Sequence, residues 1–93
     1  METAEKMPSI KQILAKGKVS FRVRRAGIIQ KQEFVVKKGI GPGGEYPYLF
    51  LDKFIDLSEL LRVSRECGLP VTAKNGNAFP PGKMAKDFVR LLK

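Results

Sequence analysis

The chain of 93 residues contains no histidine and a single cysteine. Histidine is the side chain that most often acts as a general base or a metal ligand near neutral pH, so its absence removes the commonest catalytic and zinc-binding arrangements. One cysteine cannot form an internal disulfide, which fits a reducing compartment. Cys67 falls on the apolar side of an expected helix with no histidine to activate it, so we expect a buried structural thiol.

Acidic residues are also scarce, with nine in the chain against 18 lysines and arginines. Asp52 and Asp56 come nearest to a carboxylate pair, and Asp56 is expected to cap a helix instead. A two-metal nuclease or a glycosidase needs carboxylates that converge on a cleft, and the local spacing gives no sign of them. The sequence therefore predicts a protein that is not an enzyme and that has no cofactor or metal.

Long apolar runs are missing as well. No run reaches the length that crosses a bilayer, and residues 1–12 are charged where a signal peptide would be apolar. We therefore expect a cytoplasmic protein that has no membrane partner. Residues 1–8 are polar and are expected to form a flexible N-terminal tail. Residues 9–93 should form a single domain, because a chain with 43% hydrophobic residues can bury one modest core.

The net charge of +9 is confined to one part of the chain. Ten lysines and arginines lie between Lys6 and Lys38, together with one acid, Glu33, whereas the charges of the remaining residues cancel. A basic bias that served only solubility would be spread over the whole chain. The distribution therefore favours an anionic macromolecular partner, with nucleic acid as the leading candidate.

Residues 18–38 carry the pattern around which the rest of the chain is organised. In residues 18–24, Val19, Phe21 and Val23 alternate with polar or basic side chains, which predicts a strand with one face in a core. Gly27 follows at a position suited to a hairpin turn. The return strand, residues 28–38, is also basic. Its alternation is interrupted by the apolar run 34–36, which a bulge or burial of both faces would explain.

Residues 39–47 contain four glycines and two prolines, which predicts a mobile loop. The loop lacks the Gly-Lys-Ser/Thr ending of a nucleotide-binding P-loop, which argues against that function. Tyr46 or Tyr48 is available to stack on a base beside the basic ribbon. Packing of both tyrosines on the core is the alternative.

Helices are predicted before and after the ribbon in the sequence. Ser9 and Gln12 form a capping box that opens a short helix ending at Gly17. A second helix starts at an Asp56-x-x-Glu59 cap. Its expected apolar face consists of Leu57, Leu60, Leu61, Ser64 and Cys67.

Three further elements complete the chain. Residues 48–51 form a short apolar run that we expect at the centre of the sheet. Residues 71–79 form a hairpin around an Asn75-Gly76 turn of type I′. A final helix carries an apolar stripe made of Met84, Ala85, Phe88, Leu91 and Leu92.

Together these elements predict an α+β fold. We expect a small antiparallel sheet, made of the basic ribbon, one central strand and a short C-terminal hairpin, packed by two or three helices and exposed on one face. The exposed face favours non-catalytic binding of DNA or RNA through phosphate contacts that are largely independent of sequence. The residues expected to contact nucleic acid are Lys18, Arg22, Arg24, Arg25, Lys31, Lys37, Lys38 and Tyr46.

An interaction module is the alternative function. Its basic face would bind an acidic protein, or the chain would build a small homo-oligomeric structural protein; either a monomer or a homodimer is compatible with the sequence. Exposure of the run 34–36 at a sheet edge would favour this alternative, because free strand edges pair between chains. The chain shows no helix-turn-helix spacing, RNA-recognition signature, Gly-x-x-Gly clamp or zinc finger.

Overall fold

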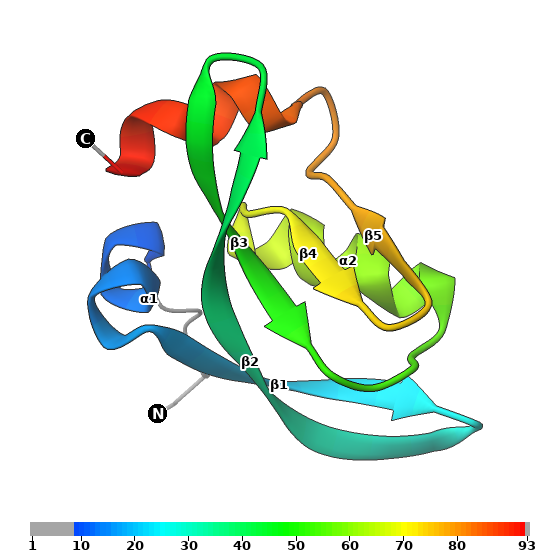
Figure 1. The fold of residues 1–93 in the computed structure, drawn as a ribbon. Coiled ribbons are helices and arrows are strands. Elements are labelled where there is room, and N and C mark those ends of the chain that lie inside the picture. Colours follow the sequence, from blue (N-terminus) through cyan, green and yellow to red (C-terminus); the bar gives the residue numbers. More distant parts are fainter. Residues whose placement is uncertain (1–8, 93) are drawn as a thin grey trace.

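A computed structural model describes residues 9–92, and the flexible tail expected at residues 1–8 lies outside this range. The described chain folds into one five-stranded sheet with strand order β1-β2-β3-β4-β5, accompanied by three helices (Figure 1). The α+β class predicted from the sequence is confirmed. The elements are α1 (Ile10–Lys16), β1 (Lys18–Arg25), β2 (Ile28–Gly41), β3 (Gly44–Leu51), α2 (Leu57–Cys67), β4 (Val71–Ala73), β5 (Gly76–Ala78) and the 3-10 helix η1 (Ala85–Leu92).

The sheet is mixed, so the expectation of a wholly antiparallel sheet is wrong at one junction. The pairs β1–β2, β2–β3 and β4–β5 are antiparallel, whereas β3 and β4 are parallel. Parallel neighbours require a crossover connection, and α2 supplies it between these two strands. β3 lies at the centre of the strand order, as predicted for residues 48–51.

The α1 helix forms as its sequence predicts. The Ser9 hydroxyl accepts a hydrogen bond from the Gln12 N–H at 3.2 Å, and the Gln12 side chain accepts one from the Ser9 N–H at 2.9 Å. Gly17 ends the helix in the left-handed conformation with φ +79°. Ile13 is buried, so the short helix is held by docking against the sheet.

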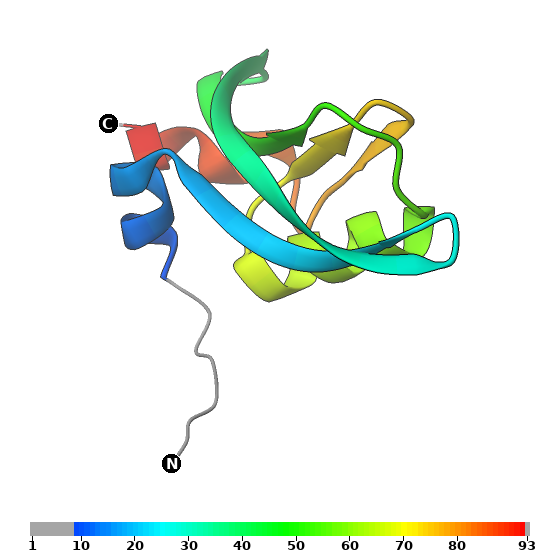
Figure 2. The same ribbon diagram turned by 90° about the horizontal axis from the view of Figure 1, so that it is seen from below.

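The ribbon of β1 and β2 confirms the predicted hairpin. Ala26 and Gly27 form its turn with φ values of +51° and +82°, the signs that a type I′ turn requires. Figure 2 shows this twisted ribbon sweeping across the molecule close to α2. β2 is 14 residues long, so it pairs with β1 in its first half and with β3 in its second half. Val35 belongs to both halves.

The apolar run 34–36 contains no bulge and is not buried on both faces. Pairing continues without a break from Lys18–Val35 to Arg25–Ile28. Phe34 is fully buried and Val36 is half-buried, whereas Val35 faces outward with an exposed fraction of 37%. The run therefore keeps the alternation of an ordinary strand.

The glycine-rich segment is a hairpin, so the prediction of a mobile loop over residues 39–47 is wrong. β2 and β3 pair as far as Gly41 and Gly44 and are joined by a two-residue turn. The Tyr46 ring lies directly over two of the glycines. A Cβ atom at Gly39 would come within 2.9 Å of this ring, and one at Gly41 within 3.3 Å. These glycines are therefore required for close packing of an aromatic ring on the backbone.

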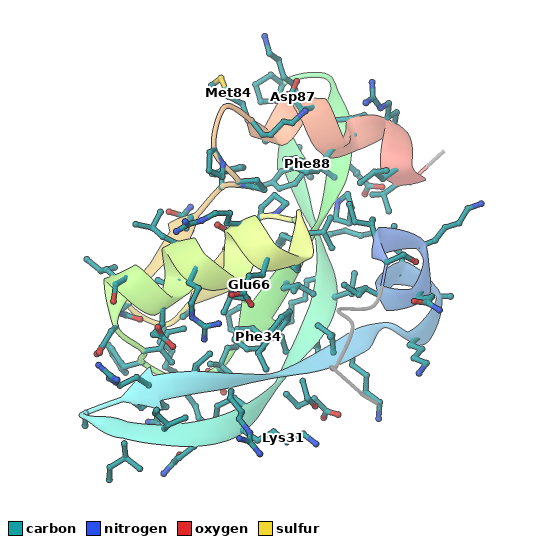
Figure 3. The ribbon with its side chains drawn as sticks, turned by 180° about the vertical axis from the view of Figure 1, so that it is seen from behind. Lys31, Phe34, Glu66, Met84, Asp87 and Phe88 are labelled. Carbon is teal, nitrogen blue, oxygen red and sulfur yellow. The ribbon has the colours of Figure 1, made fainter. Side chains whose placement is uncertain are left out.

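The core lies between α2 and the inner face of the sheet. Phe21 and Phe34 pack edge to face, with ring centroids 5.6 Å apart. Figure 3 shows Phe34 between α2 and the ribbon, and Phe88 on the inner side of η1. The other fully buried core side chains include Ile13, Val23, Leu49, Leu60, Val63, Leu69 and Val71.

The apolar face of α2 differs from the prediction. Leu60, Ser64 and Cys67 are buried as expected, but Leu57 and Leu61 are 61% and 53% exposed. Val63, which the sequence pattern did not single out, is fully buried. The helix is rotated toward the side that carries Glu59 and Arg62, because these two residues bind β1.

The C-terminal hairpin and the final helix also differ in detail from the prediction. The β4–β5 turn consists of Lys74 and Asn75, one residue earlier than predicted, and the Asn75 amide bonds both the N–H and the carbonyl of Ile55. The final helix is a 3-10 helix that buries Phe88, while Met84 lies outside it and is 63% exposed.

Adjacent leucines on α2 provide a matched test of this packing. Replacement of fully buried Leu60 by Ala should lower the free energy of unfolding by about 2–5 kcal/mol. The same change at exposed Leu61 should alter it by no more than about 0.5 kcal/mol. Urea unfolding monitored by circular dichroism measures both values. Equal losses from the two variants would mean that the orientation of α2 is wrong.

Candidate nucleic-acid interface

Five basic side chains gather on the sheet face that turns away from α2, which we call the outer face. Alternation along β1 and β2 puts every second side chain on this face, and all five are exposed. Figure 3 shows Lys31 at the margin of the ribbon, directed away from α2. We call the five cations the basic half of the outer face: Lys18, Arg22, Arg24, Lys31 and Lys37.

Two of these cations face one another directly. Arg22 of β1 is paired with Lys31 of β2 in the sheet register. Like charges at directly opposed positions destabilise a sheet. On this half of the face, Lys18 forms an ion pair with Glu33 at 3.6 Å. Neither Arg22 nor Lys31 forms an ion pair with any other residue in the range 9–92. The charges of Arg22 and Lys31 are therefore not compensated by an ion pair within residues 9–92, whereas that of Lys18 is balanced by Glu33.

The other three predicted residues lie apart from the basic half. The Arg25 Nε donates a hydrogen bond to the Phe54 carbonyl at 2.8 Å, which ties the ribbon to the segment before α2. Lys38 pairs with buried Pro47, so alternation turns it to the face opposite that of Lys37. Tyr46 is half-buried over the hairpin glycines at the margin of the outer face. The structure thus brings five of the eight predicted residues together.

Aromatic rings extend the outer face onto β3. Tyr48 pairs with Lys37, and Phe50 pairs with Val35, so both rings lie on the same face as the basic half. Both are half-exposed, and the ring centroids of Tyr46 and Tyr48 are 6.0 Å apart. The Lys37 Nζ lies 4.4 Å from the centroid of the Phe50 ring, a cation–π contact.

Phe50 was missed by the sequence interpretation, which treated residues 48–51 as uniformly apolar. The signal was present as alternation. Aromatic residues occupy positions 46, 48 and 50, and Pro47, Leu49 and Leu51 between them are buried. Period two over six residues is typical of a strand with two different faces.

The free edge of β1 is occupied by side chains of α2. The Glu59 carboxylate accepts a hydrogen bond from the Arg24 N–H at 3.0 Å, and the Arg62 guanidinium donates one to the Arg22 carbonyl at 2.6 Å. Arg62 also binds Glu59 at 2.9 Å and Glu66 at 3.1 Å. This network covers backbone groups that would otherwise be open to another strand.

The run 34–36 does not lie at a sheet edge. It belongs to β2, which is paired with β1 on one side and with β3 on the other. The arrangement that would favour strand pairing between chains through this run is therefore not found.

Hydrogen bonds from Arg62 lower the pKa of Glu59 below its usual value of 4.5, helped by the Arg24 N–H and opposed by burial. The same contacts raise the pKa of Arg62. Both groups are therefore charged at neutral pH, and the network is stabilised by charge-assisted hydrogen bonds.

The Cys67 thiol is buried on α2, and its Sγ accepts a hydrogen bond from the Leu69 N–H at 3.4 Å. Burial raises the pKa of this thiol to about 11, so it is protonated at neutral pH and has little nucleophilic character. Among residues 9–92, no group of three or more His, Cys, Asp or Glu side chains is placed to hold a metal ion. Nor does any helix in this range have the length and apolar character needed to span a membrane.

Two hollows on the described surface are lined by none of the five cations. One, of about 350 Å³, is bordered by Pro42, Phe79 and Met84 near η1. The other, of about 330 Å³, lies beside Arg25 and Phe54. Neither contains a group of carboxylates, so neither adds a reactive centre to the outer face.

No protein-family model, curated protein or solved structure matches the chain. The function is therefore argued from the residues of the outer face. Their arrangement joins a basic ribbon, with one directly opposed pair of like charges, to half-exposed rings on the neighbouring strand. Such a surface is suited to binding an anionic partner.

The Glu59 network predicts a pH-dependent stability. The pKa of Glu59 is lower in the folded state than its usual value of 4.5. The ionised carboxylate therefore contributes fully to the free energy of unfolding above pH 4.5, and this contribution is lost as the pH falls through the lowered pKa. Glu59→Gln should therefore reduce stability by about 1–2 kcal/mol at neutral pH, and the difference from the wild type should shrink in acid. Urea unfolding of both proteins from neutral to acid pH measures this difference in the free energy of unfolding.

Glu33→Gln is the matched control, because the pair between Glu33 and Lys18 is exposed on both sides. Exposed pairs contribute little, so its stability should follow the wild type at every pH. A loss for Glu59→Gln that did not change with pH would contradict the charged network.

Proposed function

We propose that this protein is a non-catalytic nucleic-acid-binding domain whose basic half contacts phosphates largely independently of base sequence. The observation that carries the proposal is the direct opposition of Arg22 and Lys31 on an exposed face. This arrangement opposes folding, and no ion pair of either side chain within residues 9–92 offsets it. A polyanion that binds the face neutralises both charges and so removes their repulsion. The arrangement therefore favours binding of a polyanion.

The spacing of the cations supports contact with an extended polyanion. The five side chains occupy two neighbouring strands, which in sheets lie about 4.8 Å apart, with successive residues on one face about 6.6 Å apart along each strand. A nucleic-acid backbone crossing the ribbon near its turn would therefore meet Arg22, Arg24 and Lys31 as immediate neighbours. Contacts of this kind position a backbone and carry no sequence information directly.

The network behind the ribbon supports the same function. Hydrogen bonds from Glu59 and Arg62 to the backbone of β1 fix the strand that carries Arg22 and Arg24 while leaving their side chains exposed. A rigid strand lowers the entropy that a binding surface loses on association. The protonated, buried Cys67 agrees with a structural thiol in a reducing compartment, and we retain the cytoplasm as the proposed location.

Salt dependence tests the proposed function. Binding to labelled oligonucleotides should weaken with a log–log slope of about −0.7 per phosphate contact on single strands and about −0.9 on duplexes. Arg22→Gln combined with Lys31→Gln should weaken binding at low salt and flatten the single-strand slope by up to about 1.4. The pair of changes should leave thermal stability equal or slightly higher, since it removes opposed like charges.

Lys86→Gln combined with Arg90→Gln is the control, because these exposed cations lie on η1 and not on the two strands that carry the basic half. Fluorescence anisotropy at several salt concentrations compares the variants. Equal losses from the two pairs would contradict the assignment of the outer face. Absence of binding at low salt, together with binding to an acidic polypeptide such as polyglutamate, would favour the interaction-module alternative.

A further inference from the structure

One row of side chains crosses the outer face from edge to edge. The pairing register connects Lys18 on β1, Val35 on β2, Phe50 on β3, Thr72 on β4 and Asn77 on β5. The row therefore begins with a cation, passes an aromatic ring at the centre and ends with side chains that donate and accept hydrogen bonds. This is the order of phosphate, base face and base edge in a nucleotide that lies across a sheet.

The rings of Tyr48 and Phe50 are not needed to complete the core. The residues that alternate with them on β3 supply it: Leu49 is fully buried, and Leu51 is 3% exposed. Tyr46 is different, because its ring covers the hairpin glycines. Tyr48 and Phe50 thus remain half-exposed on the side that faces solvent.

The Phe50 ring carries a cation over its face. The Lys37 ammonium lies 4.4 Å from the ring centroid, and Lys37 is itself exposed. Lysine has a flexible four-carbon stem with three rotatable donors at its tip. A base can therefore replace the ammonium on the ring, and the displaced ammonium remains within reach of the phosphate of the same nucleotide.

We propose that the outer face binds single-stranded nucleic acid, with successive bases stacked on Tyr48 and Phe50 and with their phosphates over the basic half. The base edges then lie toward Thr72 and Asn77. This inference rests on the proposed function and narrows the ligand from nucleic acid in general to single strands. In a duplex the bases are stacked on one another and cannot lie on the rings, whereas in a single strand every base offers its face to an aromatic side chain.

A tryptophan reporter tests the stacking. The chain contains no tryptophan, so Tyr48→Trp introduces a single tryptophan on the outer face, whose emission can be excited selectively. Addition of oligo(dT) or oligo(U) at low salt should quench its emission strongly, because a stacked base contacts the indole. Leu61→Trp, on the exposed side of α2, is the control and should not be quenched. Binding of either oligonucleotide without quenching of Tyr48→Trp would overturn the proposal.

Removal of the rings gives a second, independent measurement. Tyr48→Leu and Phe50→Leu keep apolar side chains but provide no aromatic face. Each should lower the affinity for single strands by about five- to a hundredfold. The salt slope should stay unchanged because no phosphate contact is lost. Unfolding midpoints close to that of the wild type identify variants that remain folded.

The outcomes separate this inference from the proposed function. If both leucine variants bind single strands as the wild type does, while Arg22→Gln with Lys31→Gln is weakened, phosphate binding stands and stacking is wrong. The same conclusion follows if wild-type protein binds duplexes as tightly as single strands. If no oligonucleotide binds to wild-type protein at low salt, both proposals fall.

Discussion

The alternation of side chains along β2 is the constraint on which the rest of the structure depends. This strand is long enough to pair with β1 in one half and with β3 in the other, and Val35 belongs to both pairings. One unbroken register therefore places the cations of the ribbon and the rings of β3 on the same side. A slip of β2 by one residue would turn Lys31 and Lys37 toward the core and expose Phe34 in their place.

The polar network of α2 complements this register. Glu59 and Arg62 bind the backbone of β1 at its free edge, so the helix covers an edge that would otherwise be open and holds the ribbon in position. The same contacts rotate α2, which leaves Leu57 and Leu61 exposed. Because the binding uses backbone atoms, the side chains of Arg22 and Arg24 remain on the outer face.

The features predicted correctly from the sequence are those set by local rules. The capping box at Ser9, the alternation of β1 and the turn before Ile28 each depend on a few neighbouring residues. The errors arose where distant contacts decide the outcome. The glycines at 39 and 41 serve the ring of Tyr46, and the parallel pairing of β3 with β4 follows from a crossover that periodicity does not reveal. Five of the eight predicted site residues lie together, and Phe50 was missed although alternation marked it.

The most direct measurement is an NMR titration of ¹⁵N-labelled protein with a short single-stranded oligonucleotide at low salt. The largest amide shifts should fall in residues 18–24, 31–37 and 48–50, which carry the outer face, and should decrease as salt is added. Amides on the exposed side of α2, around Leu57 and Leu61, should not shift. Shifts confined to α2 or to the surroundings of Met84, or no shifts at all, would contradict binding by the outer face.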